Sequence, residues 1–214
     1  MRGTTTEMNT SYLQLAGSVI FKRAQKHVEV ESFNDKELTI AGSGRSAYVF
    51  KLKNTKKVLK VFYPPFEHLA KREAKIYKKL EGICYFPVMH ASGENFIVID
   101  YIDGLTLFEC LVKGKHIDEN VLDEVDHAIL LAKKRGLNPS DIHLHNILIT
   151  PEGNVKLIDV VRFEQDKQCS QWDDLKRGYY KYYKKKIFPR KLPAKLLLMI
   201  AFFYKRDLLN RFVT

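Results

Sequence analysis

Apolar and polar residues alternate along much of the first hundred positions, with the period of two that is typical of half-buried β-strands. The alternation is clearest at Leu38–Ile40, Tyr48–Leu52 and Lys57–Tyr63, and a further strand is predicted at Pro87–Met89. Asn95–Tyr101 is almost continuously apolar, as expected of a central strand that is covered on both faces. The first half of the chain therefore predicts a small β-sheet.

Helical periodicity interrupts this alternation and then replaces it. Phe66–Leu80 places apolar residues three and four positions apart, and Asp118–Arg135 does the same before Gly136, a residue that suits the end of a helix. A short helix is also predicted at Leu105–Val112, and a pair of helices at Leu192–Phe212. The helical patterns thus lie mainly after the predicted sheet.

Two short apolar runs break the helical region where the strongest chemical signal lies. Ile147–Thr150 and Val155–Ile158 flank a Pro-Glu-Gly-Asn turn and predict a β-hairpin. Such a hairpin brings Asn146, at its entrance, close to Asp159, at its exit, and Asp141 lies five residues before Asn146. One amide and two acids suit the binding of Mg²⁺ on a polyphosphate and the acceptance of a hydroxyl proton. The same residue types are also common turn formers and caps.

A glycine-rich turn lies between the first two predicted strands. It reads Gly42-x-Gly44-x-x-Ala47-x-Val49, with Ala47 where a third glycine would complete the pattern. A second strand follows the turn, whereas a dinucleotide-binding fold would continue into a helix. The turn is therefore a candidate flap whose backbone N–H groups face phosphates, although an ordinary hairpin turn explains the same residues.

A lysine and a glutamate occupy positions where the pattern calls for apolar residues. Lys60 interrupts an apolar strand, and Glu73 falls on the apolar side of the following helix, with Leu69 and Ile76. A carboxylate on an inward-facing side is costly unless it is paired, and Lys60 is the nearest candidate along the chain. We therefore predict a Lys60–Glu73 ion pair, with a solvent-facing lysine as the simpler alternative.

Composition narrows the class of protein. The 214 residues suffice for one domain or two small lobes, and an apolar share of 45% is ordinary for a globular protein. Cys84, Cys110 and Cys169 are odd in number and widely spaced, which argues against a disulfide framework or zinc site and for a reducing compartment. We recognise neither a signal peptide nor an apolar run long enough for a transmembrane segment, so a cytoplasmic location is expected.

Positive charge is concentrated at the C-terminal end. From residue 176 onward, twelve lysines and arginines stand against Asp207 alone, so this basic tail accounts for the whole formal net charge of +11. Aromatic residues alternate with lysines between Tyr179 and Lys186. The aromatic residues are expected to complete a helical core while the lysines are solvated. The alternative is an anionic partner, either RNA or a membrane surface.

Taken in order, these features resemble the protein-kinase superfamily, most closely its compact RIO-type and lipopolysaccharide-core-type members. The resemblance spans about Leu38 to Leu175 and includes a hinge-like Ile99–Gly104 between the predicted sheet and the later helices. It implies an α+β, protein-kinase-like bilobal fold with a small antiparallel β N-lobe that carries one helix, and a reduced, mainly α C-lobe. The implied segments are an N-terminal extension (1–37), the N-lobe and hinge (38–103), the C-lobe with the catalytic loop (104–175), and basic aromatic helices that complete the C-lobe (176–214).

The resemblance also implies roles for single residues, with ATP and Mg²⁺ as cofactors. Lys60, held by Glu73, would contact the α- and β-phosphates, Asn146 and Asp159 would hold Mg²⁺, and Asp141 would accept the proton of the attacking hydroxyl. The hinge backbone would bind adenine, and the acceptor hydroxyl is expected on a protein serine or threonine. The implied nucleotide contacts are Gly42, Ser43, Gly44, Ala47, Val49, Lys60, Asp100, Tyr101 and Ile102.

The chain departs from the family pattern around both aspartates. Pro139-Ser140 precede Asp141 in place of His-Arg, Val160-Val161 follow Asp159 in place of Phe-Gly, and no Ala-Pro-Glu follows. Regulation by phosphorylation of a loop and a large peptide-docking platform are therefore not expected. A small-molecule or glycolipid kinase of the same fold and a pseudokinase binding module stay open as alternatives to a protein kinase.

Two histidines lie inside the candidate catalytic loop. His143 and His145 would share a face of a strand and would then be able to bind zinc. Because no third ligand lies at short range, we instead expect His145 to pack within the loop and His143 to contact the transferred phosphate.

Overall fold

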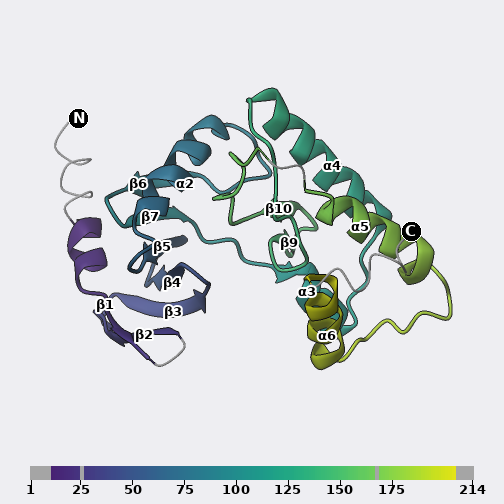
Figure 1. Cartoon of the computed structure of the whole chain (residues 1–214), viewed down its shortest axis with the longest axis horizontal. Coiled ribbons are helices and arrows are strands. Elements are labelled where there is room, and N and C mark those ends of the chain that lie inside the picture. The colour runs from purple at the N-terminus through teal and green to yellow at the C-terminus, as the bar shows by residue number, and fades with distance from the viewer. Residues whose placement is uncertain (1–10, 25–26, 167–168, 206–214) are drawn as a thin grey trace. The chain divides into compact units, whose positions relative to one another are not determined.

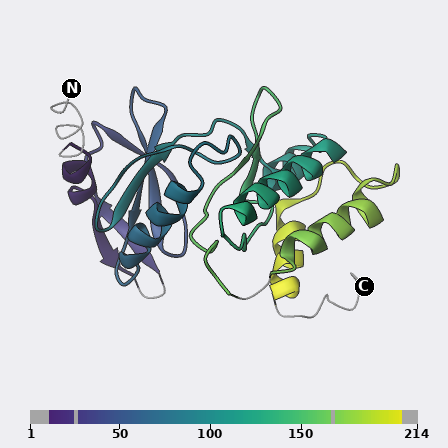
Figure 2. The same ribbon diagram turned by 90° about the horizontal axis from the view of Figure 1, so that it is seen from above.

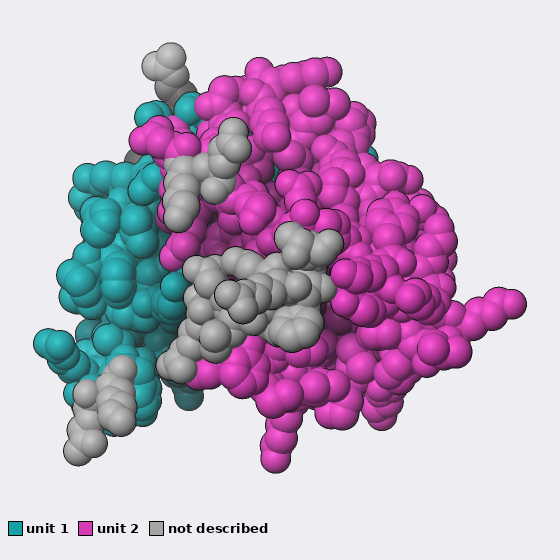
Figure 3. Space-filling view, turned by 45° about the vertical axis from the view of Figure 1, so that its right-hand side comes forward, with its two compact units in different colours: residues 1–102 teal, residues 103–214 magenta. Residues whose placement is uncertain are grey.

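The computed structural model describes residues 11–24, 27–166 and 169–205. Their contacts divide the chain into two compact units, residues 1–102 and residues 103–214 (Figure 3). The division follows Ile102, inside the segment Ile99–Gly104 that was expected to form a hinge. The first unit is dominated by β-strands and the second by helices.

Unit 1 is built on a five-stranded antiparallel sheet with one helix against it (Figure 1). Helix α2 (His68–Lys79) packs against β5, β6 and β7, and it buries Ala70, Glu73 and Ile76. The strands, in spatial order, are β3 (Leu38–Ser43), β4 (Ala47–Leu52), β5 (Lys57–Phe62), β7 (Phe96–Asp100) and β6 (Met89–Ser92). Within residues 38–102, the predicted N-lobe of one small antiparallel sheet and one helix is thereby confirmed.

Two details of the sheet differ from the prediction. Strand β7 pairs with β5 along one edge and with β6 along the other. The middle strand of the sheet, however, is β5. Strand β6 begins at Met89 rather than at Pro87. Proline has no N–H to give to a ladder and is therefore rare inside paired strands.

The N-terminal segment contributes to the core of unit 1. Residues 11–17 are helical, and strands β1 (Ile20–Arg23) and β2 (Val28–Ser32) form an antiparallel hairpin that the sequence did not predict. Tyr12, Ala16 and Val19 are buried in one cluster with sheet residues such as Phe50 and Leu59. The described part of the expected extension 1–37 therefore packs on the sheet.

Unit 2 consists of helices and a small antiparallel sheet of order β10-β9-β8. The predicted hairpin is present as β9 (Ile147–Ile149) and β10 (Val155–Leu157). Helices α4 and α5 lie side by side in two views (Figures 1 and 2). The helical elements are α3 (Leu107–Lys113), α4 (Glu119–Lys134), α5 (Gln171–Gly178), the π-helical turn η1 (Tyr179–Tyr183) and α6 (Ala194–Lys205).

The helix predicted at Leu105–Val112 starts two residues late because its first residues form a strand, β8 (Leu105–Thr106), that pairs with β9. Gly104 permits this pairing, since a Cβ atom there would lie 2.6 Å from the Ile149 carbonyl oxygen. Thr106 and Glu109 then form a capping box at the start of α3. Strand β8 was missed because two residues are too short to show alternation.

The C-terminal helices are present in part. Helix α6 covers the first half of the predicted pair at Leu192–Phe212, and the second half lies outside the described residues. None of the helices in residues 11–24, 27–166 and 169–205 has the length and apolar character that are needed to cross a membrane.

Candidate active site

Lys60 and Glu73 form the predicted ion pair in unit 1. Lys60 Nζ lies 2.9 Å and 2.8 Å from the two carboxylate oxygens of Glu73. The side chain of Glu73 is fully buried and that of Lys60 is 11% exposed. Strand β5 supplies the lysine and helix α2 the glutamate, so the pair also joins the helix to the sheet. Val49 is the direct cross-strand neighbour of Lys60 on β4.

The glycine-rich turn is held by Tyr63, at the end of β5. The Gly44 N–H donates to the Ala47 carbonyl over 2.8 Å and closes the turn. The Tyr63 hydroxyl donates to the Gly44 carbonyl over 3.0 Å, and the Tyr63 N–H donates to the Ser46 carbonyl over 3.2 Å. Burial, followed by the nearby Tyr48, raises the pKa of the Tyr63 hydroxyl, which keeps it protonated as a donor.

Neither glycine of this turn is required by the packing of the chain itself. A Cβ atom on Gly42 would meet nothing within 4 Å, and one on Gly44 would make only an ordinary contact of 3.6 Å with the Ala47 carbonyl. Neither residue adopts a positive φ. A ligand that approaches the backbone closely would explain glycine at both positions, since any side chain would stand in its way.

The hinge-like segment uses the side chain of Asp100 in an unusual way. The Asp100 N–H donates to the Val88 carbonyl over 3.0 Å, as in a regular antiparallel ladder. The Val88 N–H, however, donates to Asp100 Oδ2 over 2.9 Å, although a regular ladder would direct it to the Asp100 carbonyl. His90 Nε2 lies 2.7 Å from the other carboxylate oxygen. The carboxylate thus takes the place of the main-chain oxygen of its own residue.

This arrangement limits which hinge atoms can bind a ligand. The N–H groups of Asp100 and Tyr101 already donate to the carbonyls of Val88 and Lys56, the second over 2.9 Å. Among the described residues, these bonds leave the Ile102 N–H as the donor of the segment, and the Asp100 carbonyl is an acceptor that the Val88 N–H does not use. The expected contact of the backbone of residues 100–102 with a base stays a prediction, with the Ile102 N–H as its candidate donor.

In unit 2, Asp141 and Asn146 are joined directly. Asn146 Nδ2 donates to the Asp141 carbonyl over 3.0 Å, and the Asn146 N–H donates to the His143 carbonyl over 2.8 Å. Asn146 is buried and Asp141 is partly exposed. Because the amide nitrogen is used inside the loop, Asn146 Oδ1 is the atom of this side chain that suits a cation.

The Asp141 carboxylate lies between two cationic or polar side chains. Arg162 Nε lies 3.3 Å from Asp141 Oδ2, and His143 Nε2 lies 3.8 Å from Asp141 Oδ1. Arg162 was not identified from the sequence, because it follows Asp159 by three residues in a segment without periodicity. A basic residue so close after a candidate metal ligand was the only signal available.

The hairpin brings Asp159 next to the same loop, as predicted. The Ile158 N–H donates to the Asn146 carbonyl over 3.0 Å, and Asp159 is the following residue. Asp141 and Asp159 both adopt positive φ angles, 62° and 60°. Non-glycine residues rarely adopt this conformation, and such residues concentrate at functional sites. In the described chain only Asn54, in a turn, shares it among non-glycine residues.

The base of the candidate catalytic loop is fixed by hydrogen bonds of Asn138 and Ser140. Asn138 donates from its backbone to the Phe163 carbonyl over 2.7 Å and from Nδ2 to the Gln165 carbonyl over 2.6 Å. Ser140 is buried, and its hydroxyl donates to the Asn138 carbonyl over 2.9 Å. The segments on either side of the hairpin are thus tied together, which limits the movement of Asp141.

The two histidines of the loop do not lie on a strand. His145 stacks on Phe108 of α3, with ring centroids 4.2 Å apart, and its ring also lies 5.9 Å from that of His143, so it packs on α3 as well as within the loop. His143 faces Asp141. Among the described residues, no group of three or more His, Cys, Asp or Glu side chains is arranged to hold a metal ion.

A protein of Bacillus subtilis matches nearly the whole chain. The Bacillus subtilis (strain 168) protein named "Putative serine/threonine-protein kinase YrzF" is 46% identical over 202 residues, which cover 94% of each chain. CBL-interacting protein kinase 31 of Oryza sativa subsp. japonica is 28% identical over 89 residues, 40% of this chain and 20% of that protein. No family model matches the chain.

Among solved structures, the co-crystal structure of WbdD with the kinase inhibitor LY294002 matches with a TM-score of 0.51. The match covers 71% of this chain but only 37% of that chain, at 19% identity. At this identity the match supports the fold alone, and it agrees with the antiparallel sheet of unit 1 and the helices of unit 2. With the near-complete match to YrzF, these findings show that the chain belongs to the protein-kinase-like family and is a kinase-type phosphotransferase.

Proposed function

We propose that the protein is an ATP- and Mg²⁺-dependent serine/threonine protein kinase. The observation that carries the proposal is the arrangement of Asp141, Asn146 and Asp159, in which two aspartates with positive φ flank an asparagine that is bonded to the first of them. Holding backbone in this conformation costs about 1–3 kcal/mol per residue. A fold that maintains this conformation at both Asp141 and Asp159 is pre-organised for the catalytic roles proposed for them.

The donor set of unit 2 fits Mg²⁺. Mg²⁺ prefers oxygen ligands, and in phosphoryl-transfer enzymes it takes one or two protein side chains and fills its other positions with phosphate oxygens and water. Asn146 Oδ1 and the Asp159 carboxylate are ligands of this kind. When bound, Mg²⁺ would neutralise charge on the phosphates. Both residues come from the ends of one hairpin, so the ladder between β9 and β10 sets their separation.

The features of unit 1 suit the nucleotide. Lys60, fixed by both oxygens of Glu73, would contact the α- and β-phosphates as a positioned charge. The open space at Gly42 and Gly44 would let phosphates reach the backbone N–H groups of the turn. The Asp100 carbonyl and the Ile102 N–H would accept from and donate to adenine.

Asp141 is the candidate acceptor of the hydroxyl proton. A general base must be held within hydrogen-bond reach of its substrate, and geometry decides this before basicity does. Arg162 and His143 would restrict the carboxylate, while the bond from Asn146 restricts the backbone behind it. The catalytic set of the proposal is therefore Asp141, Lys60, Glu73 and Asn146, with Arg162 added as a positioning residue.

A protein serine or threonine is the proposed acceptor, because the 46% identical relative is named as a kinase of that class. A small-molecule or glycolipid acceptor is the second candidate. It is favoured by the short connection between Asp159 and α5, which begins at Gln171 and leaves little chain for a peptide platform. The exposed thiols of Cys84 and Cys169 suit a reducing compartment, so the proposal includes a cytoplasmic location.

Transfer of labelled γ-phosphate from ATP tests the proposal. The purified protein would be incubated with a mixture of proteins as acceptors, beside the variants Asp159→Asn and Lys60→Met. Protein labelling that both variants abolish supports the proposal. Labelling of sugars or lipids without labelling of protein would support the second candidate, a small-molecule or glycolipid kinase. Nucleotide binding without any phosphate transfer would contradict both candidates and would support a pseudokinase binding module.

A further inference from the structure

Helix α6 exposes far more apolar side-chain surface than its neighbours in unit 2. Between Lys195 and Lys205 its sequence is entirely apolar except for the hydroxyl of Tyr204. Six of its large side chains are between 37% and 54% exposed: Leu196, Leu198, Met199, Ile200, Phe202 and Phe203. Nearby in sequence, Ile187 is 91% exposed. Contiguous apolar surface of this kind marks an interaction site in folded proteins.

Among the described residues, the contacts named below that hold α6 on unit 2, close to α3, come from one side of the helix (Figure 1). Leu197 is buried, and the Tyr204 hydroxyl, seven residues later on the same side of the helix, donates to Asp174 of α5. Just before the helix, the Leu192 N–H donates to the Leu111 carbonyl of α3 over 2.9 Å. Because these contacts fix the helix on one side, the exposed apolar side chains of α6 point away from unit 2.

The connection to Asp174 persists at any ordinary pH. Burial, and then the hydrogen bond to Asp174, raises the pKa of Tyr204 to about 12. The hydroxyl therefore stays protonated and remains a donor well above neutral pH. The hydrogen bond between Tyr204 and Asp174 therefore does not depend on ionisation of the tyrosine near neutral pH.

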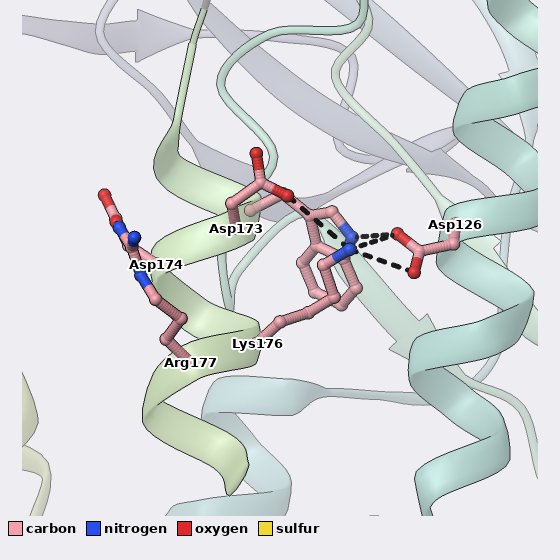
Figure 4. Close-up of polar contacts among 6 residues, drawn as sticks. Asp126, Asp173, Asp174, Lys176 and Arg177 are labelled. Carbon is pink, nitrogen blue, oxygen red and sulfur yellow. Dashed lines mark hydrogen bonds and ion pairs between the residues drawn. The ribbon is translucent and has the colours of Figure 1, made fainter. Parts of the chain in front are cut away.

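Exposed cationic side chains precede α6 along the chain and lie at its start. The described part of the basic tail, residues 176–205, contains ten lysines and arginines and no acidic residue. Lys176 and Arg177 are paired with acids of α4 and α5, namely Asp126, Asp173 and Asp174 (Figure 4), and Lys184 pairs with Glu119. Among the residues that the structure describes, Lys185, Lys186, Arg190, Lys191 and Lys195 are exposed and form no ion pair with an acid.

We propose that α6 and these five cations form a docking surface for an anionic membrane, with the helix lying in the plane of the lipid headgroups. Aliphatic side chains such as Leu198 and Ile200 would enter the acyl boundary, while the lysines contact anionic headgroups. This combination of an apolar face and basic residues is how interfacial helices bind membranes. The inference stands apart from the proposed function and does not depend on catalysis.

Other occupants fit less well. RNA would use the cations but would gain little from Leu198, Met199 and Ile200, because bases stack on aromatic or guanidinium planes. A second copy of the chain would bring two cationic segments into contact, and like charges oppose such an interface. An anionic bilayer satisfies both the charge and the aliphatic surface.

Vesicle co-sedimentation tests the inference with the full-length protein. Vesicles of phosphatidylcholine would be compared with vesicles that also contain phosphatidylglycerol. We expect binding to the anionic vesicles only, weakened by added salt. Leu198→Glu should lower the affinity at least about tenfold by placing a charge in the apolar face, and Lys185→Ala with Lys186→Ala should lower it about fivefold per lysine.

The chain offers matched controls on α4. Leu130 is 50% exposed, close to the 54% of Leu198, so Leu130→Glu adds the same charge at an equally exposed leucine. Lys133→Ala with Lys134→Ala removes two exposed adjacent lysines. Neither control should change vesicle binding, and activity measured without vesicles should be the same for Leu198→Glu as for Leu130→Glu.

Three outcomes would overturn the inference. The first is absence of binding to anionic vesicles at low salt. The second is tight binding of single-stranded RNA that the lysine variant weakens and Leu198→Glu leaves unchanged, which would identify a nucleic-acid surface. The third is a dimer, measured by light scattering, that Leu198→Glu converts into a monomer, which would identify a contact between copies.

Discussion

Asn146 holds the backbone of Asp141 by a hydrogen bond of 3.0 Å from its side-chain nitrogen to the Asp141 carbonyl. The residue proposed to bind the metal therefore also positions the residue proposed to accept the proton. The two roles use different atoms of one amide, and substitutions can separate them.

Asn146→Ala removes both atoms, whereas Asn146→Asp keeps an oxygen ligand and loses the donor. We expect the alanine variant to need at least about tenfold more Mg²⁺ for half its maximal rate, the scale on which support of a metal ligand is felt. The aspartate variant should show a lower kcat with no increased need for Mg²⁺. Rates measured over a Mg²⁺ titration distinguish the two, and equal Mg²⁺ requirements in both variants would contradict the assignment.

The Lys60–Glu73 pair allows stability and activity to be measured separately. Glu73→Ala leaves a lysine that is only 11% exposed without its partner, and breaking a buried pair from one side costs about 3–5 kcal/mol. The double variant Lys60→Met with Glu73→Leu should recover most of the free energy of unfolding, because apolar replacement of both partners is often neutral.

Both variants should nevertheless be inactive in phosphate transfer. The double variant lacks the lysine charge proposed to contact the phosphates, and Glu73→Ala keeps that charge but loses the carboxylate that positions it. Urea denaturation and labelled-ATP assays provide the two measurements. A double variant that is stable and fully active would show that the pair has a structural role only.

Arg162 should matter for the rate more than for nucleotide binding. Its guanidinium restrains the Asp141 carboxylate at 3.3 Å, and a misplaced catalytic group can cost about 10²-fold in rate. We expect Arg162→Gln to lower kcat on that scale with little change in the KM for ATP, and Arg162→Lys to recover part of it. Arg135→Gln, at an exposed arginine that ends α4, is the matched control. A wild-type kcat in Arg162→Gln would refute the positioning role.

Glu109 gives unit 2 a defined acid dependence. The backbone N–H of Thr106, which donates to the Glu109 carboxylate over 2.9 Å, is the main cause that lowers the pKa of this group below its ordinary value of 4.5. The folded state therefore favours the ionised carboxylate. Its contribution is present above about pH 4.5 and is lost as the pH falls through the lowered folded-state pKa.

Glu109→Gln keeps the hydrogen bonds of the capping box without the titration. At pH 7 the wild type should be the more stable protein by at most about 1 kcal/mol, since the group lies partly in solvent. The difference should shrink when the pH is taken below 4.5, as measured by urea denaturation at each pH. A difference that grows on acidification would contradict this reading.

The parts of the fold with strong periodicity were predictable. The alternation of β4 and β5 and the apolar side of α2 follow directly from burial on one face, and the same logic placed Glu73 opposite Lys60. The hairpin of β9 and β10 was predictable from its turn residues. In each case the information lies within a few neighbouring residues.

What could not be predicted depends on contacts between distant segments. Arg162 reaches Asp141 only because the backbone of Asn138 pairs with that of Phe163, a bond no local pattern encodes. The ladder bond that the Asp100 side chain takes from Val88 likewise requires β6 to lie beside β7. The alternation of Val28 to Glu31 was a usable signal for β2, but the turn before it carries no glycine or proline.

The burial of Tyr12, Ala16 and Val19 sets a practical limit on shortened recombinant versions of this protein. A fragment that begins at Leu38, where the kinase motifs begin, would expose Phe50 and Leu59 to solvent. The apolar surface uncovered in this way would favour aggregation. If such a fragment were insoluble, the cause would be the loss of these core residues. The result would therefore not count as evidence against the proposed roles of the catalytic residues.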